Sequence, residues 1–539
     1  MSPAVAGLIA AGLLGVALAA PAGAGEDLAR IEQAYADMND ALGAVTLIDS
    51  GYAATHGGRD RDAWSRELEA RRSAVRTGLA ALEPGGLSSE DQRAVRLMGE
   101  AVQPSDASAG LAPVARCADA SLPGLSYTAL SAALVACFDE YGNNIEFEGQ
   151  RYTRVAAFDL LARIEEPARR KALFRAFLPL WRAINDDGAA DSPYRRLIGM
   201  AATEATRHGS EIDAAARTMG VSSASVEEWL TSILDVWRVA SGGDPIEPWD
   251  YRYEGGGAER ALGDLISREA LQGLSARYYA DLGADLASMG ALYDLEPRPG
   301  KTPFAYVEFV SRGRHVEGAW RPTVTHVSAN YSRGGLGVLN ELVHENGHVV
   351  QLMAIRTRPA FMDWGDTLFA EAFADIASWN TYDPAWQRKY LGRGTGVAVS
   401  LRSLYSSVML DVAWALFELR MLRDPSADPN PVWTAITSRY LHIVPHPEIP
   451  WWAARVQLVD SPGYMVNYGL GAVLTADLRR HIAAQLGPFE TGDPRWYGWI
   501  TVRLLQDGVS RDTAALLREF LGRPASPDAL IADIRRIGR

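Results

Sequence analysis

The chain has 539 residues, of which 22% are charged, and its formal net charge is −13. This length allows two or three core-sized units or one large enzyme with lobes, and the composition is that of an ordinary globular protein. The acidic balance argues against nucleic acid as a partner, because binding to phosphates requires a basic surface.

The first segment is apolar: residues 2–25 carry no charge and are rich in Ala, Gly, Leu and Val. Small residues at alternate positions form two candidate cleavage sites, which end at Ala19 and Ala24. We expect residues 1–24 to be a signal peptide of an exported protein, although no Lys or Arg precedes the apolar run. An uncleaved membrane anchor and an unstructured tail are the alternatives. No later segment is apolar enough to span a bilayer, so we expect no stable membrane insertion of the mature chain.

Helical periodicity dominates the part of the chain that follows. Apolar residues recur at intervals of three and four, and short Gly, Pro or Asp breaks separate the runs. An N-cap serine followed by an acidic first turn opens a further helix at Ser222. Before it, the pattern predicts helices over residues 27–47, 60–82, 89–104, 126–141, 153–164, 166–187 and 192–208.

The chain contains two cysteines, Cys117 and Cys137. In an exported protein a disulfide between them is possible, whereas in a reducing compartment they would be buried thiols. Sequence leaves the choice open. Neither cysteine lies near the candidate metal ligands described below, which argues against a zinc–thiolate site.

Glycine-rich stretches interrupt the middle of the chain at 241–245 and at 254–257. We interpret both as loops that mark a hinge or a boundary between lobes. The second is not a phosphate-binding loop, because no Lys-Ser/Thr pair follows it. The expected organisation is a single catalytic unit over 25–539, with lobes of roughly 25–240 and 241–539.

The clear strand signals lie between about residues 302 and 331. Phe304–Val310 and Thr323–Tyr331 alternate in polarity and are rich in β-branched and aromatic residues. They predict one small sheet directly before residues 344–348. We expect the second strand to be an exposed edge, which can pair with the main chain of another extended segment.

His344-Glu345-Asn346-Gly347-His348 is the most informative stretch. Positions four apart lie on one face of a helix, so His344 and His348 can bind one metal ion together. Glu345 is rotated by about 100° from His344, which places it within reach of a metal-bound water. Apolar residues flank the motif with the spacing of a buried helix.

A second helical run begins near Asp366 and contains Glu371, 23 positions after His348 (371 − 348 = 23). This separation accommodates a loop and a returning antiparallel helix. A catalytic zinc takes three protein ligands and keeps a fourth position open, so we predict that His344, His348 and Glu371 bind one Zn²⁺. Asp375, one turn after Glu371, is suited to accept the second ring N–H of a ligand histidine. The alternative is a buried helix with satisfied histidines and surface carboxylates.

The motif at 344–348, followed by Glu371-Ala-Phe-Ala-Asp375, resembles zinc peptidases of the angiotensin-converting enzyme, thimet oligopeptidase and oligopeptidase F superfamily. His326-Val-Ser-Ala-Asn resembles a strand of the converting-enzyme family, and Pro248–Tyr251 is similar to a segment of the thimet-type oligopeptidases. The segment Gly463–Gly471 resembles the tyrosine-bearing helix of oligopeptidase F and of the Taq-type carboxypeptidases.

The resemblance is strong from about 300 to 475 and weaker from 145 to 300. It implies a mainly α, spindle-shaped, two-lobed fold with a deep central cleft, which admits short flexible peptides to a zinc at its floor. Carried over to this sequence, Glu345 is the general base. Tyr468, with Tyr464 as a second candidate, donates to the oxyanion, and His326 contacts the substrate carbonyl.

The expected function is therefore a zinc metallopeptidase of oligopeptidase or peptidyl-dipeptidase type, with short peptides as substrates. The alternatives are a catalytically lapsed peptide-binding protein of the same fold, a carboxypeptidase, and a hydrolase of non-peptide amides. Converting-enzyme relatives carry a Lys-x-His element shortly before the tyrosine pair, whereas His442 and His446 lie too far away to match it. Candidates for binding a peptide carboxylate are Arg312, Arg314 and Arg455. The sequence leaves the oligomeric state open.

Overall fold

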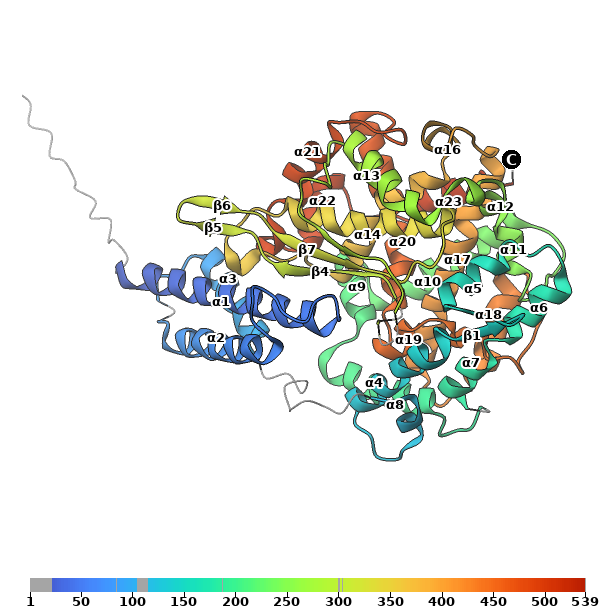
Figure 1. Ribbon diagram of the computed structural model, residues 1–539, viewed down its shortest axis with the longest axis horizontal. Coiled ribbons are helices and arrows are strands. Elements are labelled where there is room, and N and C mark those ends of the chain that lie inside the picture. The colour runs from blue at the N-terminus through green and yellow to red at the C-terminus, as the bar shows by residue number, and fades with distance from the viewer. Residues whose placement is uncertain are drawn as a thin grey trace, which may run out of the picture.

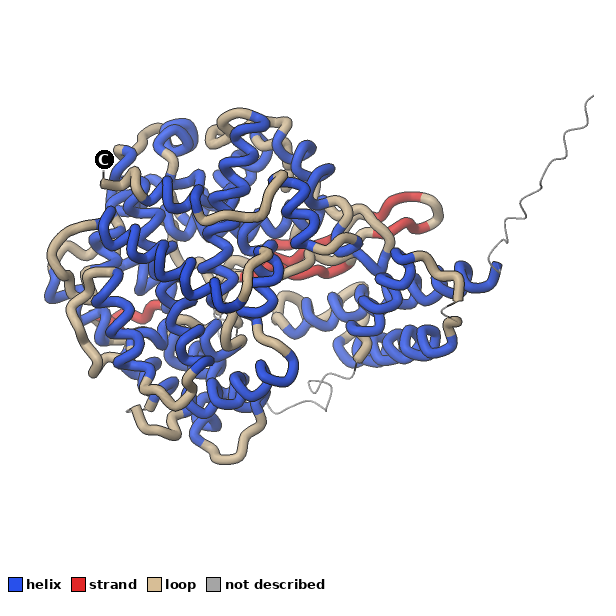
Figure 2. Tube along the Cα trace, turned by 180° about the vertical axis from the view of Figure 1, so that it is seen from behind, coloured by secondary structure: helices blue, strands red, loops and turns tan. Residues whose placement is uncertain are grey.

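The computed structural model describes residues 22–83, 85–103, 115–186, 188–298, 301–302 and 304–538. Helices dominate it and the sheets are small, which confirms the predicted fold class (Figures 1 and 2). Most of the proposed signal peptide lies outside the described residues, so cleavage and export stay predictions. Within the described ranges, no helix is both long enough and apolar enough for a membrane span.

The N-terminal helices form a projection beside the main body (Figure 1). They are α1 (Ala22–Asp49), α2 (Arg61–Ala81) and α3 (Ser89–Ala101), close to the predicted ranges. Asp60 caps α2 and Ser88 caps α3, each by accepting the backbone N–H three residues on. The three helices enclose a small apolar core of their own, to which Ala360 and Phe361 of η6 (Pro359–Phe361) contribute.

Short helices fill the chain between the projection and the middle. After the η2 turn (Cys117–Ser121), the predicted helix at 126–141 is α4 with a π-helical end, and that at 166–187 is two helices. Pro179 explains the division, since its ring clashes with the carbonyl four residues earlier and it has no N–H to donate. Cys117 and Cys137 form a disulfide. The elements are α4 (Tyr127–Cys137), η3 (Phe138–Gly142), β1 (Ile145–Phe147), β2 (Gln150–Tyr152), α5 (Arg154–Leu161), α6 (Pro167–Arg175), α7 (Leu178–Asn185), α8 (Pro193–His208), α9 (Glu211–Met219) and α10 (Ser223–Ser241).

The two glycine-rich stretches have different structures. Residues after Ser241 form a loop, as predicted, and Gly242 and Gly243 have positive φ. The interpretation of 254–257 as a loop is wrong, because these residues lie in α11 (Tyr251–Gly255) and α12 (Gly257–Leu262). A Cβ on Gly256 would lie 2.8 Å from the Cβ of Ala162, so close packing between segments explains the glycine. The η4 (Gly263–Leu265) and η5 (Arg268–Ala270) turns and α13 (Leu271–Asp281) follow.

The largest sheet has three strands in the order β3-β7-β4. β7 (Val324–Ser328) lies between β3 (Leu292–Asp294), to which it is parallel, and β4 (Tyr306–Ser311), to which it is antiparallel. The prediction that this strand is an exposed edge is therefore wrong. Its last four residues are buried without alternation, the pattern of a strand covered on both faces. A separate hairpin of β5 (Arg314–Val316) and β6 (Ala319–Arg321) extends toward the projection (Figure 1).

One hydrophobic core runs from Cys117 to Ile537 and crosses the predicted lobe boundary near residue 240. The second core of the molecule is that of α1–α3 and does not correspond to either predicted lobe, so the lobe division stays a prediction. The remaining elements are α14 (Leu336–Ala354), α15 (Thr367–Ser378), η7 (Trp379–Tyr382), α16 (Pro384–Leu391), α17 (Val397–Arg423), α18 (Pro429–Tyr440), η8 (Trp451–Ala454), α19 (Gln457–Asp460), α20 (Met465–Leu486), α21 (Trp496–Ile500), η9 (Thr501–Leu505), η10 (Gly508–Ser510), α22 (Thr513–Leu521) and α23 (Asp528–Ile534).

Candidate metal centre

Two buried helices, α14 and α15, cross at a glycine. A Cβ on Gly347 would lie only 2.6 Å from the Cα of Ala374 and 2.8 Å from its carbonyl oxygen. No side chain fits in this space, so Gly347 allows the two backbones to approach closely. On its other side, α14 is anchored by Asn346, which accepts from Tyr293 at 2.7 Å and donates to Ser275 at 2.8 Å.

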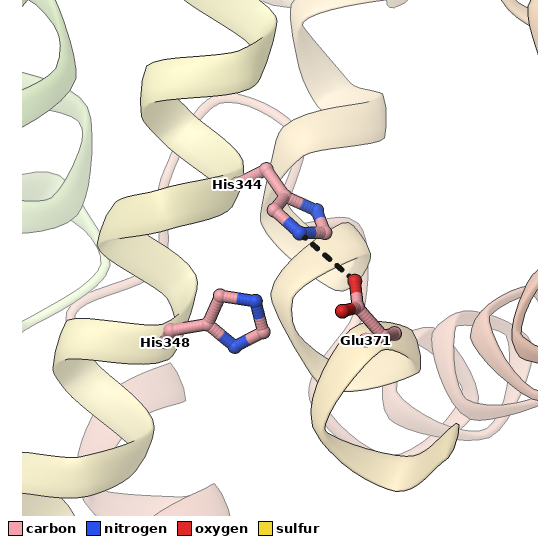
Figure 3. Close-up of side chains that lie close together, drawn as sticks. All are labelled: His344, His348 and Glu371. Carbon is pink, nitrogen blue, oxygen red and sulfur yellow. Dashed lines mark ion pairs between the residues drawn. The ribbon is translucent and has the colours of Figure 1, made fainter. Parts of the chain in front are cut away.

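The crossing brings His344, His348 and Glu371 together (Figure 3). One possible ligand atom from each residue lies within 4.8 Å of the other two. His344 Nε2 lies 3.3 Å from Glu371 Oε2, and this carboxylate oxygen is buried without a hydrogen-bond partner. Two imidazoles and a carboxylate are the donor set of a catalytic zinc site with an open position. The residues therefore fit one divalent ion.

Each of two ligand candidates is held by a second contact. Nδ1 of His344 donates to Asp375 Oδ1 at 2.7 Å, which leaves Nε2 of the same ring facing Glu371. Asp375 Oδ1 also accepts from Ser378 Oγ at 2.8 Å. The hydroxyl of Tyr464 donates to Glu371 Oε1 at 2.6 Å, which leaves Oε2 available. Such contacts orient a ligand and fix its tautomer.

The local charges prepare two of these groups to bind a cation. Burial, followed by the nearby His344, lowers the pKa of His348 to about 4, so its ring is neutral at pH 7. Burial works against ionisation of Glu371, but the hydrogen bond and the charge of His344 outweigh it and lower the pKa to about 2. A neutral imidazole and an ionised carboxylate are the forms that bind metal.

Glu345 lies beside the ligands but does not bond to them. Its side chain lines the cavity described next, and Oε2 has no hydrogen-bond partner among the described residues. Burial is the main cause that raises the pKa of Glu345, to about 8. A carboxyl group poised near neutral pH can accept a proton and return it.

A cavity of about 370 Å³ opens over His344 and Glu345. This volume falls in the range of small-ligand sites, about 300–1000 Å³. Tyr468 lines the cavity, and no hydrogen bond occupies its hydroxyl within the described chain. Tyr464 is not among the residues that line the cavity, and its hydroxyl donates to Glu371 instead. The ring centroids of the two tyrosines are 5.6 Å apart, but their surroundings differ. Tyr468 lines the cavity, and Tyr464 supports the ligand candidate Glu371.

His326 lies in β7 of the three-stranded sheet and not on α14 or α15, which carry the ligand candidates. Its side chain is fully buried, and Nδ1 bonds to Glu308 Oε1 at 2.9 Å on the neighbouring strand. Its ring packs 5.0 Å from that of Tyr52, in the loop after α1. It is not among the residues that line the cavity. A contact between His326 and substrate stays a prediction, and this placement does not favour it.

Of the three arginines predicted to bind a peptide carboxylate, only one lines the cavity. Arg312 binds Asp363 at 3.0 Å, and Arg314 binds Asp37 at 2.7 Å, both outside the cavity. Arg455 does line the cavity. Sequence reasoning missed two other arginines there, Arg154 and Arg252. Arg252 directly follows the segment Pro248–Tyr251 that resembles the thimet-type oligopeptidases, so that resemblance was the available signal.

No family model and no curated protein matches the sequence. Solved structures do match the fold. A metallocarboxypeptidase 1 of Trypanosoma cruzi shares 13% identity at a TM-score of 0.57, over 95% of this chain and 99% of that one. An M32 carboxypeptidase of Deinococcus radiodurans shares 13% identity at a TM-score of 0.53, with the same coverage. PZ peptidase A shares 14% identity at a TM-score of 0.53, over 94% and 96%.

These similarities extend over nearly the whole of each chain. They confirm at the level of the fold the resemblance that the motifs at 344–348 and 371–375 indicated. The helical architecture is thus that of known metallopeptidases, with the candidate ligands of this chain on two of its buried helices.

Proposed function

We propose that this chain is a zinc-dependent metallopeptidase that hydrolyses peptide bonds of short peptides. The observation that carries the proposal is the convergence of His344, His348 and Glu371 next to the unpaired carboxyl of Glu345. The similar folds named as carboxypeptidases and as a PZ peptidase support it, as does the cavity above the site. A protein of this fold without turnover is not favoured, because the base and all three ligand candidates are retained.

A zinc ion, when bound, supplies a Lewis acid and lowers the pKa of a coordinated water. Glu345 would accept a proton from the attacking water and pass it to the departing amine, and His344, His348 and Glu371 would hold the ion. Tyr468 donates its hydroxyl hydrogen to the oxygen on which negative charge develops. Asp375 holds the ring of His344 with Nε2 toward the metal position.

The type of peptidase follows from how the substrate is held. The sequence favours an oligopeptidase or a peptidyl-dipeptidase, and the folds of the two carboxypeptidases make the carboxypeptidase alternative equally compatible with the architecture. Because the cavity has a limited volume of about 370 Å³, we propose short peptides as the substrates in each case.

The decisive test is Glu345→Gln, which keeps the size of the side chain and removes its basicity. We expect hydrolysis of a fluorogenic peptide to fall about 1000-fold or more while zinc content, measured by atomic emission, stays at one ion per chain. The matched control is Glu69→Gln on α2, where the side chain is 59% exposed. Retained turnover in the Glu345 variant would remove it as the base.

The ligand set has its own test. Glu371→Ala should lower zinc occupancy sharply, since it leaves only two protein donors. Unchanged metal content in this variant would contradict the ligand role of Glu371. Zinc-loaded wild-type protein that cleaves no peptide from a mixed library would contradict the proposed function itself.

A further inference from the structure

Three arginine side chains line the cavity that the candidate metal ligands share. Arg154 begins α5, Arg252 lies in α11, and Arg455 follows η8. These segments are distant in the sequence and meet only in the folded chain. An arginine is charged at all physiological pH values, so the wall carries three cations.

Two of these cations have no carboxylate partner among the described residues. Arg455 pairs with Asp411. Arg154 donates from Nη1 to the carbonyl of Ala454 at 3.3 Å, and its Nε has no partner. Arg252 makes no hydrogen bond or ion pair within the described chain, and its guanidinium stacks 4.1 Å above the ring centroid of Phe158.

The two unpaired guanidiniums lie near each other. The Cζ of Arg154 is 6.0 Å from the centroid of the same Phe158 ring that Arg252 covers. Burial, with the charge of Arg455 next, lowers the pKa of both groups to about 10. Burying a charge without a counter-ion is costly, and groups held in this way are common at ligand sites.

Most acidic groups that line the cavity are paired with other residues. Asp411 pairs with Arg455, Asp159 with Arg333 at 2.6 Å, and Glu259 with Arg163. Glu341, one turn before Glu345 on α14, also lines the cavity, and the charge of Arg154 acts to lower the pKa of its carboxyl group. No ion pair joins Glu341 to either unpaired arginine within the described residues, and burial raises its pKa. Arg154 and Arg252 are therefore left without an ion pair among the described residues, and an anion from outside can supply one.

The wall belongs to the same cavity as the proposed reaction site. The Cζ of Arg455 lies 5.5 Å from the ring centroid of Tyr468, the candidate oxyanion donor. An anionic group bound at the wall would thus lie in the same cavity as the scissile bond. The planar guanidinium fork matches a carboxylate with two parallel hydrogen bonds.

We propose that Arg154 and Arg252 bind a carboxylate of the substrate peptide and so select peptides that carry one near the scissile bond. This inference rests on the proposed function, since it names the substrate class of the same site. The carboxylate comes either from the C-terminus of the peptide or from an acidic side chain. The chemistry of recognition is the same, and the source decides whether the enzyme trims ends or cleaves internally.

Binding to the full-length, zinc-loaded Glu345→Gln protein tests the inference without turnover. Three N-acetylated tetrapeptides are compared by isothermal titration calorimetry: a free acid without acidic side chains, its C-terminal amide, and an amide with a glutamate in the last position. We expect one of the two carboxylate-bearing peptides to bind about 10- to 100-fold more tightly than the neutral amide. Tight binding of the free acid identifies the C-terminus, and tight binding of the glutamate amide identifies a side chain.

Arginine variants in the same background assign the effect. Arg252→Gln should remove most of the preference, and Arg154→Lys, which keeps the charge but loses the fork, should weaken it. Arg151→Gln on β2, where the side chain is 71% exposed, is the matched control and should leave the preference intact. Melting temperatures of all variants establish that they are folded.

Two results would overturn the inference: equal affinity for all three peptides, or a preference that survives in both Arg154→Lys and Arg252→Gln. Neither result touches the proposed function, which is contradicted only if zinc-loaded wild-type protein hydrolyses no peptide.

Discussion

The metal-site helices and the N-terminal projection are held in place by different means. The helices α14, α15 and α20 lie within the large core and contact one another through buried groups; Thr475 of α20, for example, donates to the carbonyl of Ala372 at 3.0 Å. The projection has a separate core. It packs against β4, where a Cβ on Gly43 of α1 would clash with the carbonyl oxygen of Val310. It also meets the β5–β6 hairpin through ion pairs, in which Arg314 binds Asp37 at 2.7 Å and Asp40 at 2.9 Å.

This difference separates a site inside the main core from a neighbour that has a core of its own. Close packing specifies positions to a fraction of an ångström, and this accuracy is needed to hold three metal ligands. The ion pairs at the hairpin join side chains that are 13–25% exposed, so each pair depends on its opposite charge being present. We therefore expect substitutions of buried residues to impair the site, and substitutions that remove a charge to destabilise the projection. The predictions below test that contrast.

The largest effect is expected from the two tyrosines. Tyr468→Phe removes a free hydroxyl that faces the cavity, so kcat should fall about 100- to 1000-fold with little change in KM. Tyr464→Phe removes the donor to Glu371 and should instead weaken zinc binding about 10- to 100-fold. Steady-state kinetics and competition with a zinc chelator distinguish the two. Equal kinetic and metal phenotypes for both variants would contradict the division of roles.

The helix crossing gives the next effect. Gly347→Ala places a methyl group against the backbone of Ala374, and we expect it to cost about 1–3 kcal/mol of unfolding free energy and to lower zinc affinity. Gly199→Ala in α8 is the matched control, because no atom lies within 4 Å of the added Cβ. The control should be neutral or stabilising by up to about 1 kcal/mol. Denaturant titrations of both variants measure the difference.

A pH-dependent effect follows from Glu418 in α17, whose carboxylate accepts the N–H groups of Gly463 and Met465 at the start of α20. Burial raises the pKa of Glu418 from 4.5 to about 8. The folded chain thus holds this proton more tightly than the unfolded chain, so the stabilisation is complete below pH 4.5 and is lost as the pH rises to about 8.

Glu418→Gln cannot ionise and lacks this loss. Relative to the variant, the wild-type protein should therefore lose a few degrees of melting temperature between pH 5 and pH 8. Thermal scans across that range measure it. A constant difference between the two proteins would show that Glu418 keeps the same protonation state throughout.

The smallest effect belongs to the projection. Arg314→Gln breaks the pairs with Asp37 and Asp40, which keep their other partners Arg71 and Arg321, and should cost about 1 kcal/mol of unfolding free energy. Hydrogen exchange should quicken in α1 and α2 while α14 stays protected. Equal quickening in α14 would mean that the projection and the metal site unfold together.

The chain's local patterns predicted that His344, His348 and Glu371 lie together, because the relevant geometry is local. His344 and His348 share a helix face through a four-residue interval, and the apolar flanks show that this helix is buried. Asp375 was predicted to accept the ring N–H of a ligand histidine, and the structure shows it 2.7 Å from His344 Nδ1. The fold class followed from the same periodicity.

Predictions that depended on neighbours were less successful. β7 was expected at an edge, but β3, a three-residue strand with little pattern of its own, covers it. The glycines at 254–257 resembled a loop because sequence does not show which side chains approach them.

Sequence by itself therefore determined the helical class and the donor set, since both rest on intervals of a few residues within one helix or between two successive helices. Only the tertiary structure decided which tyrosine faces the cavity and that Arg154, Arg252 and Arg455 share its wall. Those positions depend on how segments that are far apart in the chain pack together and on which charges remain unpaired. A local sequence pattern contains no information on these long-range contacts.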